Sequence, residues 1–163
     1  ISIGSNKNLK EMIRGVSLKM LLVPLSTIAG TLAFSVLASL LISQWGMADC
    51  LAVGSGFAYY SLSSVLITEL KEASVGIQVA TELGTLALLA NIIREMMSLL
   101  GAPIFSRFFG KLAPISAAGI NSMDVLLPMI TRCSGKHMVP LAILHGIILE
   151  LTVPFLVSFF CKM

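Results

Sequence analysis

Five long apolar stretches dominate this chain and set its fold class. They cover about residues 20–43, 47–68, 83–109, 112–131 and 138–160. A helix needs about 20 consecutive apolar residues to cross the hydrocarbon core of a bilayer, and it satisfies its own backbone hydrogen bonds there. The pattern therefore predicts an all-α integral membrane protein. We expect about five transmembrane helices over residues 20–163, preceded by a polar connector over residues 1–19.

The composition agrees with a membrane location. Charged residues make up 12% of the chain, whereas soluble globular domains contain about 25%. So little charge excludes most soluble enzyme classes and intrinsic disorder. The three cysteines lie in unrelated segments and form no metal-binding or redox motif, so we expect no metal and no cofactor.

The basic residues predict how the chain is oriented. If all five stretches cross, seven lysines and arginines lie on the side of the connector and three on the other side. Basic residues concentrate on the cytoplasmic side of membrane proteins, so we expect a cytoplasmic connector and an external C-terminus. The larger group is Lys7, Lys10, Arg14, Lys19, Lys71, Arg132 and Lys136, and the smaller group is Arg107, Lys111 and Lys162.

Two of the stretches do not resemble simple lipid-facing helices. The stretch 47–68 contains GSGFAYYSLSS, and the stretch 112–131 is interrupted by GINSMD. Non-helical backbone at membrane depth is tolerated only where protein or a water-filled cavity covers it, and transporters use broken helices of this kind around their substrates. Close helix packing through small residues is the alternative for the glycines and serines.

Three ionisable residues lie deep in the apolar stretches. Arg94 and Glu95 are near the middle of the stretch 83–109, and Asp124 lies in the polar interruption. Such residues usually face a cavity and mark ion or substrate pathways. The alternatives are that Arg94 and Glu95 form a neutralised anchor for helix packing and that Asp124 is a buried helix cap. We expect Asn121 or Ser122 to cap a half-helix that starts near GINSMD and whose N-terminus could bind a carboxylate.

Four further polar residues lie in the apolar stretches, and their pattern indicates their roles less specifically. They are Tyr60, Ser61, His145 and Glu150. His145 and Glu150 are five residues apart, which is not a zinc-site spacing, and we expect His145 to make an interhelical hydrogen bond. The role of Glu150 is open. Tyr60 and Ser61 could line a polar cavity, although tyrosines are also common at membrane interfaces.

Four segments resemble the C-terminal half of the bacterial lysine exporter (LysO) family. They are GFAYYSLSSVLITE at 56–69, IRE at 93–95, NSMDVLLP at 121–128, and MVPLAILHGIILELTVPFLVSFF at 138–160. The opening GSNKNLKEMIRG is similar to the central connector of that family. The resemblance implies an inner-membrane exporter of L-lysine and thialysine that exchanges its substrate with protons.

The same resemblance implies a fold and two important residues. The fold would be one inverted-repeat unit of the cation/proton antiporter and bile-acid transporter type, with two broken helices. The two acids that the resemblance marks are Glu95 and Asp124. The chain opens at Ile1 and lacks the family's N-terminal half, so we expect a fragment or one chain of a split transporter, completed by a companion chain or a second copy. Glu150 stands where the resemblance implies a small polar residue.

The electrical cost of exporting a cation indicates a mechanism. Moving a cation out of a negative interior costs about 2.3 kcal/mol per charge per 100 mV, and entry of one proton cancels this cost. We expect Glu95 and Asp124 to alternate between a proton and lysine, with Asn121 and Ser122 near the substrate carboxylate. One alternative is a sodium-coupled transporter or another cation or organic-ion transporter. The other is a structural membrane subunit of a split transporter. An intramembrane protease is disfavoured because Asp124 is the only deep aspartate.

Overall fold

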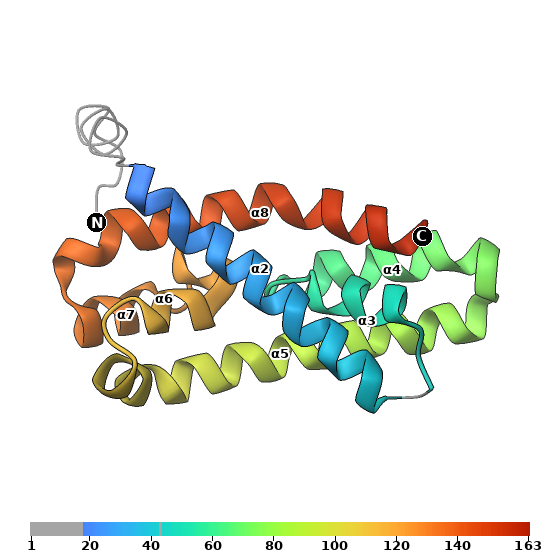
Figure 1. Cartoon of the computed structure of the whole chain (residues 1–163), viewed down its shortest axis with the longest axis horizontal. Helices are drawn as coiled ribbons and strands as arrows, with labels where there is room; N and C mark the ends of the chain where they lie inside the picture. Colours follow the sequence, from blue (N-terminus) through green and yellow to red (C-terminus); the bar gives the residue numbers. More distant parts are fainter. Residues whose placement is uncertain (1–17, 43) are drawn as a thin grey trace.

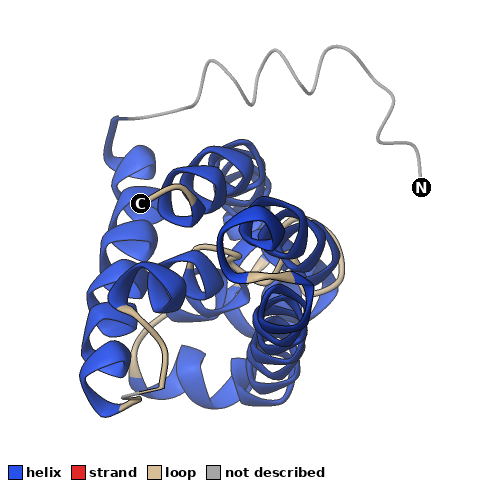
Figure 2. Cartoon of the chain, turned by 90° about the vertical axis from the view of Figure 1, so that its right-hand side faces the viewer, coloured by secondary structure: helices blue, strands red, loops and turns tan. Residues whose placement is uncertain are grey.

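Three long helices form the frame of the molecule. The computed structural model describes residues 18–42 and 44–163, so most of the predicted connector 1–19 lies outside the described residues. The long helices are α2 (Leu18–Leu41), α5 (Ile77–Phe108) and α8 (Val139–Cys161). Within the described residues these three are the helices that are long and apolar enough to cross a membrane. The described part is helical with short connecting loops (Figure 2).

The first of the two interrupted stretches folds back on itself. Helix α3 (Met47–Gly54) runs to the middle of the molecule, and α4 (Tyr60–Val75) returns to the end from which α3 started (Figure 1). The return is fixed by an ion pair between Lys71 Nζ and Asp49 Oδ1, 2.7 Å apart. We call residues 47–75 the first hairpin.

The second interrupted stretch also folds back, from the opposite end. It consists of α6 (Ala113–Ala118), the 3₁₀ helix η1 (Gly119–Ser122) and α7 (Leu127–Ser134), and the short η2 (Lys136–Met138) follows. The Ser106 hydroxyl near the end of α5 donates to the Cys133 carbonyl at the end of α7 (2.9 Å), so α7 ends close to where α6 begins. We call residues 113–134 the second hairpin.

The two hairpins correct the expectation of five crossing helices. Neither 47–68 nor 112–131 runs from one end of the molecule to the other (Figure 1). The chain reverses at backbone conformations that a continuous helix excludes: Phe57 and Ala58 have φ values of +44° and +73°, and Gly119 has +63°. Non-glycine residues rarely adopt positive φ, so these reversals depend on contacts from the surrounding helices.

The tips of the two hairpins meet in the middle of the molecule. The Ile120 backbone N–H donates to the Phe57 carbonyl at 3.0 Å. A Cβ on Gly119 would lie 2.3 Å from the same oxygen, so glycine permits this close approach. Helix α8 packs against both tips and α5 packs against both hairpins. The tips therefore lie against the long helices α5 and α8.

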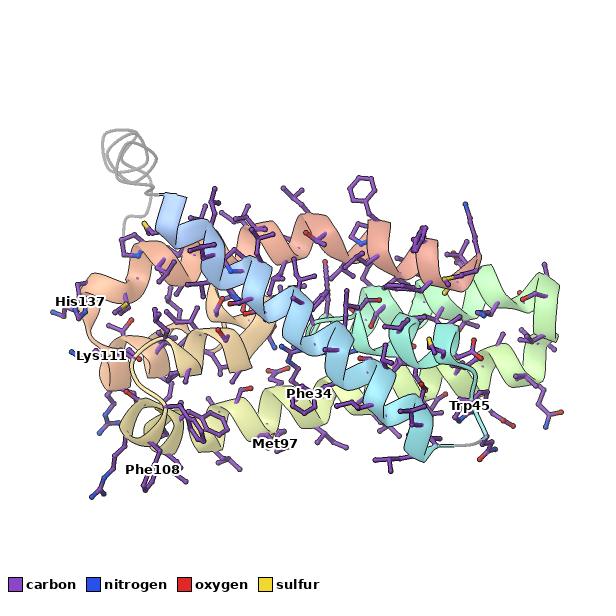
Figure 3. All side chains as sticks on the ribbon, viewed as in Figure 1. Phe34, Trp45, Met97, Phe108, Lys111 and His137 are labelled. Atoms are coloured by element: carbon purple, nitrogen blue, oxygen red, sulfur yellow. The ribbon has the colours of Figure 1, made fainter. Side chains whose placement is uncertain are left out.

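The outer surface is largely apolar. Phe34, Met97 and Phe108 are among its many exposed large hydrophobic side chains, and Figure 3 shows them on α2 and α5. A soluble monomer rarely exposes apolar side chains so continuously. This surface is that of a multi-pass membrane protein.

Charged residues collect at the two ends of the molecule. Because the hairpins fold back, residues that the five-crossing arrangement assigned to opposite sides lie at one end, where Figure 3 labels Lys111 and His137. That end carries Arg107, Lys111, Arg132 and Lys136, and α2 also starts there. The other end carries Asp49, Glu69, Lys71, Glu72, Glu82 and Lys162. Among the described residues, one end therefore carries a net positive charge and the other a net negative charge.

Candidate functional site

A cavity of about 160 Å³ lies where the two hairpin tips meet. Its walls come from both tips and from the middles of α5 and α8. It brings together five of the eight residues that the sequence proposed for a site, namely Tyr60, Ser61, Glu95, Asn121 and Asp124. The remaining lining residues are Ala58, Tyr59, Ile120, Met123, Val125 and Glu150.

Three carboxylates line this cavity. Glu95 comes from α5, Asp124 from the turn after η1, and Glu150 from α8. Glu95 and Glu150 are half-buried, whereas Asp124 is exposed and its Oδ1 accepts the Val125 N–H at 2.6 Å. None of the described lining residues is lysine or arginine, and the described ion pair, Lys71 with Asp49, lies elsewhere. The cavity therefore suits a cation.

A buried amide adds an unpaired donor. Asn121 is 6% exposed, and its Nδ2 has no hydrogen-bond partner within the described part of the chain. A buried polar group without a partner costs free energy, and such groups are uncommon in folded proteins. An Nδ2 atom carries two N–H donors. The Asn121 Nδ2 atom is enclosed by protein atoms, so it would donate to a ligand oxygen once the side chain turned toward the cavity that Asn121 lines.

Asn91 holds the first hairpin tip in place, a role that the sequence analysis missed. Its Oδ1 accepts the Ala58 N–H at 2.7 Å, and its Nδ2 donates to Ser63 Oγ at 3.2 Å and to the Ala87 carbonyl at 2.8 Å. The side chain thereby satisfies an N–H at the strained reversal. The only signal in the sequence is an asparagine within an apolar helix.

Arg94 faces away from the cavity that holds its neighbour Glu95. Its Nε donates to the Ala117 carbonyl at 3.2 Å, and its Nη2 to the Ser116 carbonyl at 3.3 Å. These carbonyls belong to the last turn of α6, where helix carbonyls lack partners and a positive charge is favourable. This geometry fits the packing role that was the alternative for Arg94.

Ser122 and His145 form a separate buried chain of polar groups. Ser122 Oγ lies 3.1 Å from His145 Nδ1 and donates to the Ala142 carbonyl at 2.9 Å. His145 Nε2 lies 3.1 Å from Thr27 Oγ1 on α2. The chain links α2, η1 and α8 at completely buried positions, so these are the interhelical bonds expected of His145. Neither Ser122 nor His145 lines the cavity.

Helix α7 starts later than the sequence analysis expected. It begins at Leu127, after a turn over residues 123–126, and the residue before it, Leu126, provides no side-chain cap. Asn121 and Ser122 therefore do not cap this helix, because they belong to η1 and the turn over residues 123–126 separates them from it. Asn121 lines the cavity as part of η1 at the tip of the second hairpin.

Among the described residues, neither a second cavity nor any metal-binding group is a stronger candidate for the functional site than this cavity. A larger cavity of about 250 Å³ lies between α2, α3 and α5, but apart from Ser35 and Asp49 its lining is apolar or weakly polar. Within the described ranges no three histidine, cysteine or acidic side chains are grouped so that they could hold a metal ion. The convergence of acids at the hairpin tips makes the smaller cavity the candidate site.

Comparison with known proteins places the sequence in a family. The family described as "Lysine exporter LysO" matches residues 1–161. Lysine exporter LysO of Escherichia coli (strain K12) is 40% identical over 110 residues, which are 68% of this chain and 34% of that protein. A putative lysine exporter of Haemophilus influenzae (strain ATCC 51907 / DSM 11121 / KW20 / Rd) is 36% identical over 110 residues, which are 68% of this chain and 52% of that protein. The match thus spans about a third of one relative and about half of the other. No solved structure matches.

Proposed function

The chain belongs to the lysine exporter LysO family, and on that premise we propose that it forms the substrate-binding part of a membrane protein that exports L-lysine and thialysine. The observation that carries the proposal is the cavity between the hairpin tips. L-lysine presents two ammonium groups and one carboxylate at neutral pH. The cavity offers three carboxylates and one unpaired amide donor, with no lysine or arginine in its described lining.

Glu95 and Asp124 couple lysine to protons in this proposal. A carboxylate can carry a proton or face an ammonium group, and one occupant excludes the other. Glu95 is half-buried on the long helix α5, whereas Asp124 is exposed on the tip of the second hairpin. A ligand that bridges them would link the frame of the molecule to a hairpin tip. Movement of the tip could then carry the site between the two sides of the membrane.

The arrangement of helices supports alternating access. Helix α2 followed by the first hairpin, and α5 followed by the second hairpin, run in opposite directions through the molecule (Figure 1). We interpret these two units as an inverted repeat within the chain, with the site at their junction. The part of the relatives that this chain does not match, or a second copy of the chain, would cover the exposed side of the cavity. That side includes Tyr60, Ser61 and Asp124.

We assign the basic end of the molecule to the cytoplasm. Four described basic residues lie at the end where α2 starts, whereas the opposite end holds four acids and two lysines. Basic residues favour the cytoplasmic side, so the C-terminus of α8 would lie outside the inner membrane.

Transport into inside-out vesicles tests this function. Vesicles that contain the intact gene product should accumulate labelled lysine when their lumen is acidic, and collapse of the pH gradient should stop the accumulation. A sodium gradient at fixed pH should have no effect. Accumulation that needs sodium and ignores the pH gradient would replace protons with sodium as the coupling ion. Vesicles that accumulate no lysine under either gradient would overturn the proposed function.

A further inference from the structure

Glu150 is a third carboxylate that a proton exchange at Glu95 and Asp124 does not require. It lies in the middle of α8, is half-buried and lines the cavity. Within the described part of the chain no basic side chain comes within salt-bridge distance of it. A carboxylate that is partly shielded from water in a membrane-spanning helix is stabilised by a positively charged partner. A ligand with more than one positive group can be that partner.

Asn121 provides an independent sign of a ligand in the same cavity. Its side chain is more than nine-tenths buried, and its Nδ2 has no hydrogen-bond partner among the described residues. An N–H donor in a cavity lined by carboxylates cannot serve a second ammonium group, because both are donors. It can serve a carboxylate or a carbonyl oxygen. The cavity therefore combines acceptors for positive groups with a donor for a negative one.

We propose that Glu150 determines specificity for diamino acids, by binding one of their two ammonium groups while the Asn121 side chain turns toward the cavity and its Nδ2 donates to their carboxylate. This inference rests on the proposed function and concerns the same cavity. One ammonium group of the substrate then faces Glu150, and the other faces Glu95 and Asp124, which exchange it for a proton. An amino acid with an apolar side chain would leave one more carboxylate without a partner.

The consequence is discrimination by charge. A site built to bind a polar group rejects an analogue that lacks it, because the group of the protein is then left unpaired. The cavity should bind lysine best and cadaverine, which lacks the carboxylate, less well. It should bind norleucine, which lacks the second ammonium group, least well.

Variants of Glu150 in the intact gene product test the inference. Glu150→Gln removes the charge at nearly constant size, and Glu150→Asp keeps it. Hydrogen bonds to charged groups contribute enough that Glu150→Gln should raise the KM for labelled lysine in proteoliposomes by about tenfold, with a nearly unchanged kcat. Glu150→Asp should stay within about threefold of the unaltered protein. The matched control is Glu82→Gln, which removes an exposed carboxylate of α5 outside the cavity.

Competition measurements on the unaltered protein give a readout that does not depend on a variant folding. Unlabelled cadaverine should compete with labelled lysine more strongly than norleucine does. Equal competition by the two analogues, or a KM in Glu150→Gln equal to that of the unaltered protein, would overturn the role of Glu150 while leaving lysine export intact. Absence of lysine uptake by the unaltered protein would instead overturn the proposed function, and this inference with it.

Discussion

The Ile120 backbone N–H donates to the Phe57 carbonyl oxygen across 3.0 Å, which joins the tips of two hairpins that enter from opposite ends of the molecule. The two residues are far apart in sequence, and each belongs to a turn that reverses the chain. The candidate site depends on this junction because both tips contribute to the lining of the same cavity.

Substitution of Gly119 should separate the tips. Gly119→Ala would place a Cβ 2.3 Å from the Phe57 oxygen and force alanine to adopt a φ of +63°. The backbone conformation of Gly119, with φ +63° and ψ −133°, is sparsely populated by other residues and alone costs them about 1–3 kcal/mol. We expect a lower thermal unfolding temperature and loss of lysine transport.

Gly30→Ala is the matched control for that substitution. Gly30 lies in helix α2, and a Cβ there would meet no atom within 4 Å. Alanine should therefore leave transport unchanged and raise stability slightly, since glycine in a helix interior is unfavourable by about 0.5–1 kcal/mol. Equal effects of the two substitutions would contradict the proposed junction.

Removal of the Asn91 side chain should destabilise the first tip. In Asn91→Ala the Ala58 N–H, which now donates to Asn91 Oδ1 at 2.7 Å, would be buried without a partner. An unsatisfied buried donor costs about 1–3 kcal/mol, so unfolding temperature and transport should both fall. Thermal unfolding of the purified protein measures the first effect. An unchanged unfolding temperature would show that the tip does not need this bond.

Cysteine accessibility should distinguish the hairpins from five crossing helices. Single cysteines at Gln44, Glu72, Lys111 and Lys136, all exposed positions, are placed in a background free of native cysteines. With two hairpins, an impermeant thiol reagent reaches positions 44 and 72 from one side of the membrane and 111 and 136 from the other. With five crossing helices, 44 would pair with 111 and 72 with 136. The second result would contradict the fold.

The loss of the Asn121 amide should affect substrate binding. Because hydrogen bonds to charged groups contribute about 1.5–3 kcal/mol, Asn121→Ala should raise the KM for lysine at least tenfold. Ser122→Ala is the control, because the Ser122 hydroxyl already donates to the Ala142 carbonyl and does not line the cavity. It should lower stability by about 1 kcal/mol and leave the KM unchanged. The reverse pattern would place the substrate carboxylate at Ser122.

The sequence alone indicated the acids that line the candidate cavity better than it indicated the path of the chain. An acid within an apolar stretch is costly wherever the stretch lies, so Glu95 and Asp124 could be selected without knowledge of the fold. Apolar length does not distinguish a helix that crosses from two shorter helices that turn back. The ion pair between Asp49 and Lys71 joins the two arms of the first hairpin, and their separation in sequence gives no sign of it.

The positions of three other residues, Arg94, Glu150 and Asn91, could not be predicted from the sequence. Arg94 and Glu95 are adjacent, but neighbouring helical side chains point about 100° apart, so one meets α6 and the other the cavity. Glu150 lines the cavity because α8 packs against both tips, and the sequence does not reveal this packing. From the sequence, Asn91 can be recognised only as a polar residue near Glu95. Its hydrogen bond with the Ala58 N–H depends on how the first tip is folded.

Lysine transport by variants with neutralised acids tests the central claim most directly. Inside-out vesicles with an acidic lumen would contain the intact gene product with Glu95→Gln, with Asp124→Asn, with both, or with the exposed control Glu82→Gln, at matched amounts of inserted protein. We predict that each of the first three reduces accumulation of labelled lysine to background, while Glu82→Gln accumulates it normally. Undiminished accumulation by the double variant would contradict the account.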